Sequence, residues 1–161
     1  MPNVICVAST QCVLGGLALF IANGQGGDDI IDASESSFPV ILIGDDGVDT
    51  LTGGSGSDIV IGDYGRVSWT TSNYSDEVVA TTGGGGYNDF TDGVIRTASI
   101  IKSFAASEGG NDVIVLGEGD NVGIGGAFDD TIESGTGNDI VAGDSVEIHF
   151  IAASTSPESI T

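Results

Sequence analysis

Single apolar residues recur at intervals of 9, 18 or 20 positions along two stretches of the chain, each within a short glycine-rich polar segment. Each stands two places after an aspartate. In an extended segment, neighbouring side chains point to opposite faces, so we expect these residues to point inward from very short strands. They are Ile31, Leu51, Val60, Ile114, Ile132 and Val141. Nothing in the chain has sustained helical periodicity.

The same pattern occurs twice along the chain. Residues 40–69 align without a gap on residues 121–150, an offset of 81 in a chain of 161. A repeat of this extent indicates two copies of one structural unit. Between them, 66–71, 77–82 and 94–104 are rich in β-branched and aromatic residues and predict strands joined by loops. Residues 84–92 predict a hairpin tip.

Residues 53–61, GGSGSDIVI, fit a nine-residue pattern GGxGxDxUx, in which U is apolar. This pattern resembles the repeats-in-toxin (RTX) family, whose nonapeptides bind calcium. The same frame, with aspartate at its sixth place, is found at 24–32, 44–52, 107–115, 125–133 and 134–142.

The resemblance implies a right-handed parallel β-roll in which two nonapeptides make one turn, so that loops 18 residues apart stack. This arrangement would place Asp112 over Asp130, Asn121 over Asp139, and Asp29 beside Asp49, with Asp58 facing residues 33–40. Each ion would lie between adjacent loops, with six to eight oxygen ligands at about 2.3–2.6 Å.

The residues themselves suit this chemistry. Alternate glycines permit tight turns with positive φ, so that carbonyl oxygens can point to one spot and act as hard ligands. We therefore predict several Ca²⁺ ions and the metal-ligating residues Asp29, Asp49, Asp58, Asp63, Asp112, Asn121, Asp130, Asp139 and Asp144. Second- and fifth-place carboxylates are expected to be solvated loop charges: Asp28, Asp45, Asp120 and Asp129.

Some units depart from the frame. Residues 116–124 have asparagine at the sixth place and Gly123 at the apolar place, and 125–133 have Phe128 in place of a turn glycine. We expect both units to bind calcium less well, and the side of the first copy that contains 33–40 to lack a site. Asp63 and Asp144 each follow a glycine at the end of a run. Either one could ligate the last ion or cap a turn through backbone amides.

Composition agrees with a thin, stacked fold. The chain is 40% apolar with positive mean hydropathy, which argues against a disordered acidic tail. It has 27 glycines and few aromatic residues, so a wide core is not expected. The net charge is −21, which excludes nucleic acid as a partner and favours divalent cations between the carboxylates. Arg66, Arg96 and Lys102 all lie between the two aspartate-rich runs.

Two cysteines, Cys6 and Cys12, are too few for a disulfide framework and leave either a local bridge or two free thiols. The apolar stretch 13–22 is about half the length of a membrane-spanning helix, so no membrane span is predicted. The chain has no basic residue before Arg66, which argues against a cleaved signal peptide. An N-terminal module resembling the later one is the favoured alternative.

No catalytic constellation is evident. The chain has one histidine, His149, in a predicted strand, where a surface or packing role is expected. No HExxH or GxSxG motif occurs. Paired carboxylates could in principle hydrolyse glycosides, but three basic residues and one tryptophan leave little for a sugar-binding groove. We do not expect an enzyme.

We predict an all-β fold in which calcium-loaded parallel β-roll (β-solenoid) segments alternate with antiparallel β-hairpins, and 81-residue modules that stack or string end to end. The expected regions are the tail of a preceding hairpin (1–23), a first roll (24–65), a hairpin region (66–106), a second roll (107–146) and the start of another hairpin (147–161).

Two functions are compatible with this organisation. The first is a structural module of a large extracellular or cell-surface protein, such as a filament, surface layer or adhesin, with neighbouring copies of the module as partners. The second is a calcium-dependent folding and secretion appendage of a toxin or secreted hydrolase. Further 81-residue modules in the flanking sequence would favour the first, and a pore-forming or catalytic domain the second.

Overall fold

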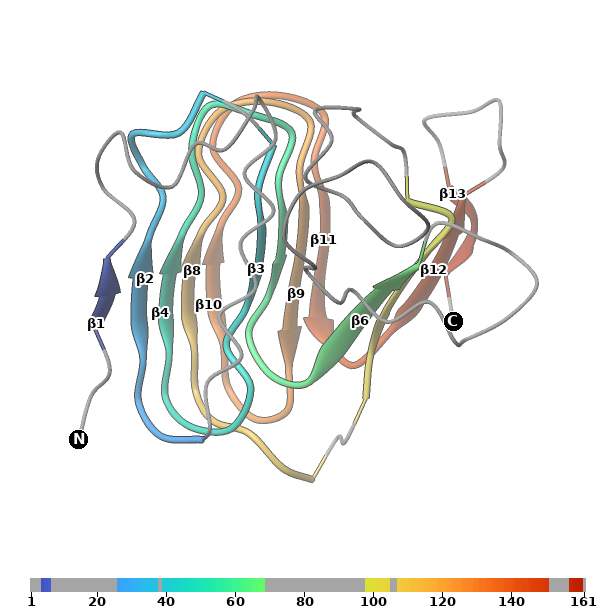
Figure 1. The fold of residues 1–161 in the computed structure, drawn as a ribbon. Coiled ribbons are helices and arrows are strands. Elements are labelled where there is room, and N and C mark those ends of the chain that lie inside the picture. Colours follow the sequence, from blue (N-terminus) through green and yellow to red (C-terminus); the bar gives the residue numbers. More distant parts are fainter. Residues whose placement is uncertain are drawn as a thin grey trace, which may run out of the picture.

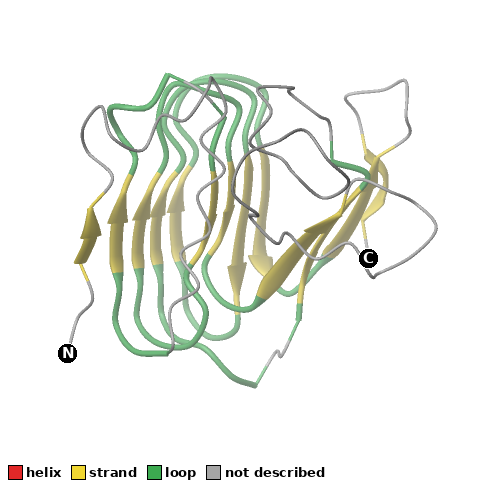
Figure 2. Cartoon of the chain, in the orientation of Figure 1, coloured by secondary structure: helices red, strands yellow, loops and turns green. Residues whose placement is uncertain are grey.

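A computed structural model describes residues 4–6, 26–37, 39–68, 98–104, 107–150 and 157–160. These residues form strands and loops, with no helix among them, so none of the described segments is a helix that could cross a membrane. Three sheets account for the strands (Figures 1 and 2). The prediction of an all-β fold with a parallel roll and an antiparallel part is confirmed.

Sheets A and B are parallel and form the two walls of the roll. Sheet A has the order β1 (Val4–Cys6), β2 (Ile30–Asp32), β4 (Thr50–Thr52), β8 (Val113–Val115) and β10 (Thr131–Glu133). Sheet B has the order β3 (Ile41–Ile43), β5 (Ile59–Ile61), β9 (Val122–Gly126) and β11 (Ile140–Asp144).

Sheet C is antiparallel and contains β6 (Gly65–Ser68), β7 (Ile100–Ser103), β12 (Glu147–Phe150) and β13 (Pro157–Ile160), in the order β13-β12-β7-β6. Its strands leave the roll after β5 and β11 (Figure 1). Lys102 and His149 both contact Glu147 on this sheet, at 2.6 Å and 2.5 Å. The single histidine of the chain therefore belongs to a small polar group on strand β12, next to a core that its neighbour Ile148 enters.

The two runs join into one roll. Strand β4 of the first run pairs with β8 of the second, with Thr50 opposite Val113, and β5 pairs with β9, with Ile59 opposite Val122. The register matches the one within a run, where Thr131 lies opposite Val113. The 81-residue copies therefore stack directly, although the chain leaves and re-enters the roll between them.

The core inside the roll is formed by the recurring eighth-place residues, as the pattern predicts. Ile31, Leu51, Val60 and Ile114 are at most 1% exposed. The last turn is different, because Ile132 is only partly buried and Val141 is 47% exposed. Val141 lies opposite Gly123, in line with the buried Val60, so it is on the inward side as expected. It stays exposed because the terminal strand β11 has a described neighbour on one side only.

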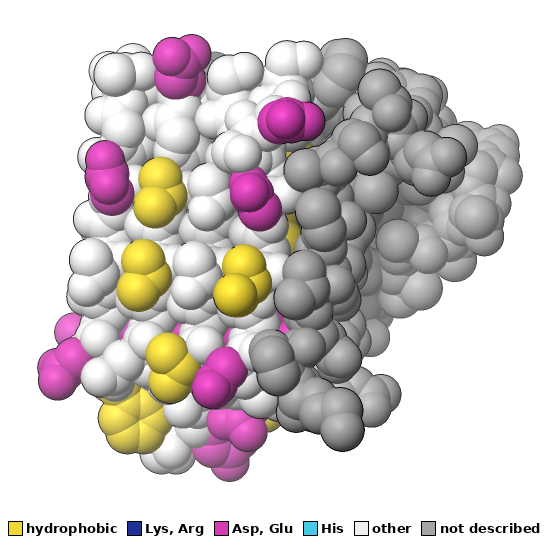
Figure 3. All heavy atoms as spheres, turned by 90° about the vertical axis from the view of Figure 1, so that its left-hand side faces the viewer, with side chains coloured by type: hydrophobic (Ala, Val, Ile, Leu, Met, Phe, Trp, Pro, Cys, Tyr) yellow, Lys and Arg dark blue, Asp and Glu magenta, His cyan; other side chains and the backbone are white. Residues whose placement is uncertain are grey.

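A second core lies between sheets B and C. The seventh and ninth residues of the sheet B units are apolar, and they are covered by Val67, Ile101 and Ile148 of sheet C together with the flanking Ala98 and Val146. The corresponding residues of sheet A are largely exposed, with Ile30 at 49% and Val113 at 43%. On the side where sheet A lies, isolated hydrophobic side chains stand among polar and acidic ones (Figure 3). The roll thus has one covered and one exposed wall.

The irregular unit 116–124 is internally compensated. Its first place holds Leu116 in place of glycine, and the side chain of Leu116 is fully buried. Its apolar place holds Gly123, where an added Cβ would lie 2.9 Å from Leu116 Cδ1. Leu116 therefore fills the core volume that the glycine leaves open, so that the packing of the roll continues through this unit.

Residues 1–23 are only described at β1, and there the expectation of a hairpin tail needs correction. Val4 lies opposite Ile30 in a parallel pair, so this strand extends the roll. Its partner β2 offers a free parallel edge, which explains why the N-terminal strand adds in this direction. The remainder of 1–23, the possible Cys6–Cys12 bridge and the predicted strands and loop within 69–97 lie outside the described residues and side chains.

Candidate calcium sites

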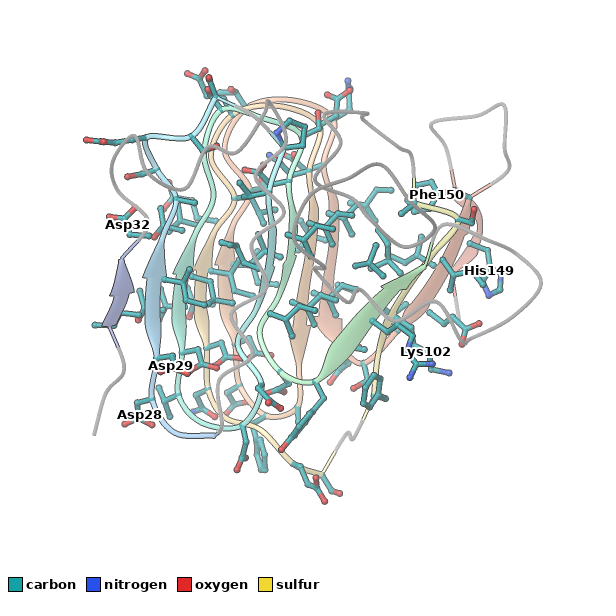
Figure 4. All side chains as sticks on the ribbon, in the orientation of Figure 1. Asp28, Asp29, Asp32, Lys102, His149 and Phe150 are labelled. Carbon is teal, nitrogen blue, oxygen red and sulfur yellow. The ribbon has the colours of Figure 1, made fainter. Side chains whose placement is uncertain are left out.

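The loops of the roll form two edges. The Asp29 edge contains the loops that lead into sheet A, with sixth-place residues Asp29, Asp49, Asp112 and Asp130. The Asn121 edge contains the loops that lead into sheet B, with sixth-place residues Asp58, Asn121 and Asp139. In Figure 4, Asp28 and Asp29 mark the Asp29 edge, at the end of β2 opposite Asp32.

A ladder of hydrogen bonds runs along the Asp29 edge. The Asp29 N–H donates to Asp49 Oδ1 at 2.8 Å, the Asp49 N–H to Asp112 Oδ1 at 2.8 Å, and the Asp112 N–H to Asp130 Oδ1 at 2.9 Å. The predicted neighbours Asp29–Asp49 and Asp112–Asp130 are thus adjacent. The step from Asp49 to Asp112 spans 63 residues and was not predicted, because it depends on the chain returning to the roll.

The second carboxylate oxygen of three of these aspartates has no partner. Oδ2 of Asp49, of Asp112 and of Asp130 is buried without a hydrogen bond among the described residues. Burial raises the pKa of Asp49 to about 6 and that of Asp112 to about 8, with nearby carboxylates adding to the effect. Burial also raises the pKa of Asp130. A cation beside these oxygens would remove the cost of charging them.

Backbone carbonyls face the same three oxygens. An added Cβ at Gly44 would collide with both Asp49 Oδ2 and the Gly62 carbonyl oxygen. At Gly62 it would collide with Asp112 Oδ2 and lie 2.5 Å from the Gly125 carbonyl oxygen. At Gly125 it would collide with Asp130 Oδ2 and lie 2.5 Å from that of Gly143. Each first-place glycine therefore leaves a space that a carboxylate and a carbonyl of the next turn share.

These three spaces have the donor set that calcium prefers, which is hard oxygen from carboxylates and backbone carbonyls. No three His, Cys, Asp or Glu side chains converge on one point among the described residues. Each site therefore has one sixth-place aspartate and depends on carbonyl oxygens for further ligands. Asp29 is buried at the start of the ladder, but the first place of its unit, residue 24, lies outside the described part.

The loop at Asp112 is composite, because its parts come from both sides of the excursion to sheet C. Gly62 has the position relative to Asp112 that Gly44 has relative to Asp49. Next to it, Asp63 is 1% exposed and its Oδ1 accepts the Gly110 N–H at 3.0 Å. Its Oδ2 accepts the Ala127 N–H. Of the two roles considered for Asp63, the structure shows turn capping. Asp144, its counterpart after β11, is exposed.

The Asn121 edge has the same ladder but different ends. The Asp58 N–H donates to Asn121 Oδ1 at 2.7 Å, and the Asn121 N–H donates to Asp139 Oδ1 at 2.9 Å. Asp58 accepts the Val40 N–H at Oδ1 and the Gly54 N–H at Oδ2, at 2.9 and 2.7 Å. Both of its oxygens therefore have partners, one of them from the irregular 33–40 segment.

Fifth-place side chains, which were expected to be solvated loop charges, form an outer set of contacts between turns. Asp28 Oδ1 accepts the Val48 N–H at 3.1 Å, and Asp120 Oδ1 accepts the Asn138 N–H at 2.9 Å. The Asp129 N–H donates to Asn111 Oδ1. These side chains are exposed, so they add turn-to-turn contacts and do not enter the three spaces. The recurrence of Asp or Asn at the fifth place is the sequence feature from which these contacts could have been predicted.

Stacked glycine-rich loops with a row of buried, partnerless carboxylate oxygens define a metal-binding β-roll. The family model of the RTX calcium-binding nonapeptide repeat (4 copies) matches residues 41–66, 107–123 and 115–145. The chain therefore carries RTX repeats and is a calcium-binding repeat module. No curated protein and no solved structure matches the chain significantly.

Proposed function

We propose that this chain is a calcium-dependent structural module of a large secreted or cell-surface repeat protein, and that the Asp29 edge binds the ions. The observation that carries the proposal is the row of buried Oδ2 atoms of Asp49, Asp112 and Asp130, each opposite a glycine carbonyl of the next turn. A cation beside each of these three buried oxygens would offset the cost of burying a charged carboxylate.

Bound calcium would supply positive charge to an edge that otherwise repels itself. Asp49, Asp112 and Asp130 would each contribute one carboxylate oxygen, and Gly62, Gly125 and Gly143 one carbonyl oxygen each. The net charge of −21 destabilises the calcium-free fold through repulsion between carboxylates. Each hydrophobic core has only a single sheet on either side of it. Binding free energy therefore becomes folding free energy.

A location outside the cell fits this dependence. Extracellular calcium modules have dissociation constants of about 0.1–1 mM, far above the calcium level of a cytosol. A chain of this charge would stay expanded at low calcium and fold where calcium is plentiful. The RTX match supports the same location, because such repeats are typical of secreted proteins.

Stacking between modules supports a role in an extended structure. Within the chain, the second copy adds its strands to sheets A and B of the first with unchanged register. At the other end of the second copy, β10 and β11 each have a single neighbour among the described strands. A further module could add there by the same backbone pairing, which is how filaments, surface layers and long adhesins extend. We propose no reaction for the chain.

A calcium titration of the whole chain tests the proposal. Circular dichroism should show β-structure appearing as calcium rises from excess chelator to the millimolar range, and isothermal titration calorimetry should give the number of ions. Sedimentation velocity in the same samples reports compaction and assembly. A chain that is already compact and β-rich in chelator would contradict coupled folding, and failure to bind calcium would contradict the assignment of the module.

A further inference from the structure

We infer that the Asn121 edge is held together without calcium, because the side-chain amide of Asn121 replaces the partnerless carboxylate oxygen of the Asp29 edge and itself bonds the nearby carbonyls. This inference rests on the proposed calcium role of the Asp29 edge. It makes the roll one-sided, with ions along one edge and hydrogen bonds alone along the other.

Asn121 is 1% exposed, and every polar atom of its side chain has a partner. Oδ1 accepts the Asp58 N–H at 2.7 Å, as the sixth-place aspartates do on the other edge. The amide nitrogen Nδ2 donates to the carbonyl oxygens of Glu118 and Gly119, at 3.3 and 3.1 Å. In place of a partnerless oxygen beside loop carbonyls, this unit therefore has a donor that satisfies two carbonyls of its own loop.

The neighbouring loop is closed in a similar way. Asp58 has both carboxylate oxygens bonded to backbone N–H groups, from Val40 and Gly54. At Gly53 an added Cβ would lie 2.5 Å from the Leu116 carbonyl oxygen and 2.7 Å from Asp58 Oδ2, so the shape of the space is kept. The difference lies in the Gly54 N–H, which donates to the oxygen that would otherwise bind an ion.

Three changes relative to the regular frame thus agree. The carboxylate at place six has become an amide in Asn121, the first-place glycine has become Leu116 with its side chain in the core, and the segment before Asp58 is irregular. Among the described residues, the buried partnerless oxygens of sixth-place side chains all belong to the Asp29 edge. The three ions we assign to that edge are then the full set for the described loops in which a sixth-place oxygen is buried without a partner.

Calcium stoichiometry in four variants tests this inference. Asp112→Asn should bind one ion fewer than the parent chain, whereas Asp58→Asn should bind the same number, both measured by calorimetry at saturating calcium. Asn121→Asp should bind one ion more, because the carboxylate restores an oxygen beside the Glu118 and Gly119 carbonyls. Asn138→Asp is the matched control, since it adds the same charge at an exposed fifth place on the same edge and should not change the number.

The outcomes separate the two proposals. If the parent chain binds no calcium, the proposed function fails. If the parent binds calcium but Asp58→Asn loses an ion as Asp112→Asn does, the function stands and the one-sided roll is overturned. If Asn121→Asp is folded by circular dichroism and gains no ion, the assigned role of the amide is also overturned. Should Asn121→Asp fail to fold, the Asp58→Asn result alone still decides.

Discussion

The two edges of the roll use one nine-residue frame and differ in how their buried oxygens are satisfied. On the Asp29 edge, Asp49, Asp112 and Asp130 each leave one buried oxygen without a partner. On the Asn121 edge, Asp58 and Asn121 use every side-chain polar atom in hydrogen bonds. The ladder of hydrogen bonds from backbone N–H groups to sixth-place side-chain oxygens is common to both edges. On the proposed function, a bound cation would allow the buried carboxylates of the Asp29 edge to stay charged inside the stack.

The largest effect on this comparison should come from removing calcium. Excess chelator leaves three buried carboxylates of the Asp29 edge uncompensated, whereas the Asn121 edge loses nothing. For each site held at 100-fold its dissociation constant, the free energy of unfolding should fall by roughly 2.7 kcal/mol. Denaturant titrations at several calcium concentrations measure this. A stability that does not depend on calcium would remove the distinction between the edges.

Gly62→Ala should strongly destabilise the Asp29 edge. The new methyl group would collide with Asp112 Oδ2 and crowd the Gly125 carbonyl, which blocks a site and overpacks the composite loop. Overpacking costs about 1–3 kcal/mol in addition to the lost ion. Gly143→Ala is the matched control at the equivalent place of the second copy, where an added Cβ meets nothing within 4 Å. Thermal melts in calcium should show a large loss for the first variant only.

Asp130→Ala should remove one ion and lower the free energy of unfolding in calcium by roughly 2.7 kcal/mol, because it deletes a buried ligand oxygen. Asp129→Ala changes the preceding, exposed residue of the same loop and should stay within about 0.5 kcal/mol of the parent. Calorimetry and melts on both variants compare them. Equal effects would show that the frame of the loop has been misassigned.

Asn121→Ala tests the other edge. The Glu118 and Gly119 carbonyls lose their side-chain donor, and the buried Asp58 N–H loses its acceptor. The expected cost is about 1–3 kcal/mol. Since no ion is assigned there, the loss should be the same at two saturating calcium concentrations in denaturant titrations. A loss that additional calcium repairs would indicate a bound ion on this edge.

The smallest expected effect is a gain. Phe128 has φ 73° at a place where glycine is usual, and the residue is 60% exposed. Phe128→Gly should relieve about 1 kcal/mol of backbone strain in the folded state. Part of this gain is offset because glycine raises the conformational entropy of the unfolded chain. Asp45→Gly is the comparison, with φ 81° but an aspartate, which tolerates this conformation better. Denaturant melts should rank Phe128→Gly as the more stabilising of the two.

Much of the Asp29 edge could be predicted because it depends on local chemistry. The nine-residue frame places the aspartates, the glycines and the inward apolar residues, and the 18-residue turn that the RTX resemblance implies stacks Asp112 on Asp130. The stacking of Asp49 on Asp112 could not be predicted in this way, because residues 63 positions apart meet only if the chain between them returns to the roll. The role of Asp63 depends on the same closure, since its partners Gly110 and Ala127 lie beyond it.

The sequence also contains a pattern that predicts a covered wall, in addition to the recurring apolar eighth place. The seventh and ninth places are apolar in the sheet B units, as in Ile41 and Ile43, whereas β4 of sheet A has Thr50 and Thr52. Residues on both faces of a strand are apolar when both faces are buried. This contrast indicates that something covers sheet B, although it does not identify sheet C as the cover.

Turn chemistry and alternation act within nine residues, so the residues alone predicted short strands with inward apolar side chains between tight glycine-rich loops. The RTX resemblance added that these strands are parallel and that the loops bind calcium. The folded structure was needed to show that both runs make one roll, that sheet C packs on one wall, and that Asn121 satisfies its own loop. The reason is physical: loop conformation is set by neighbouring residues, whereas the partner of a buried oxygen is set by whichever distant backbone the closed chain brings beside it.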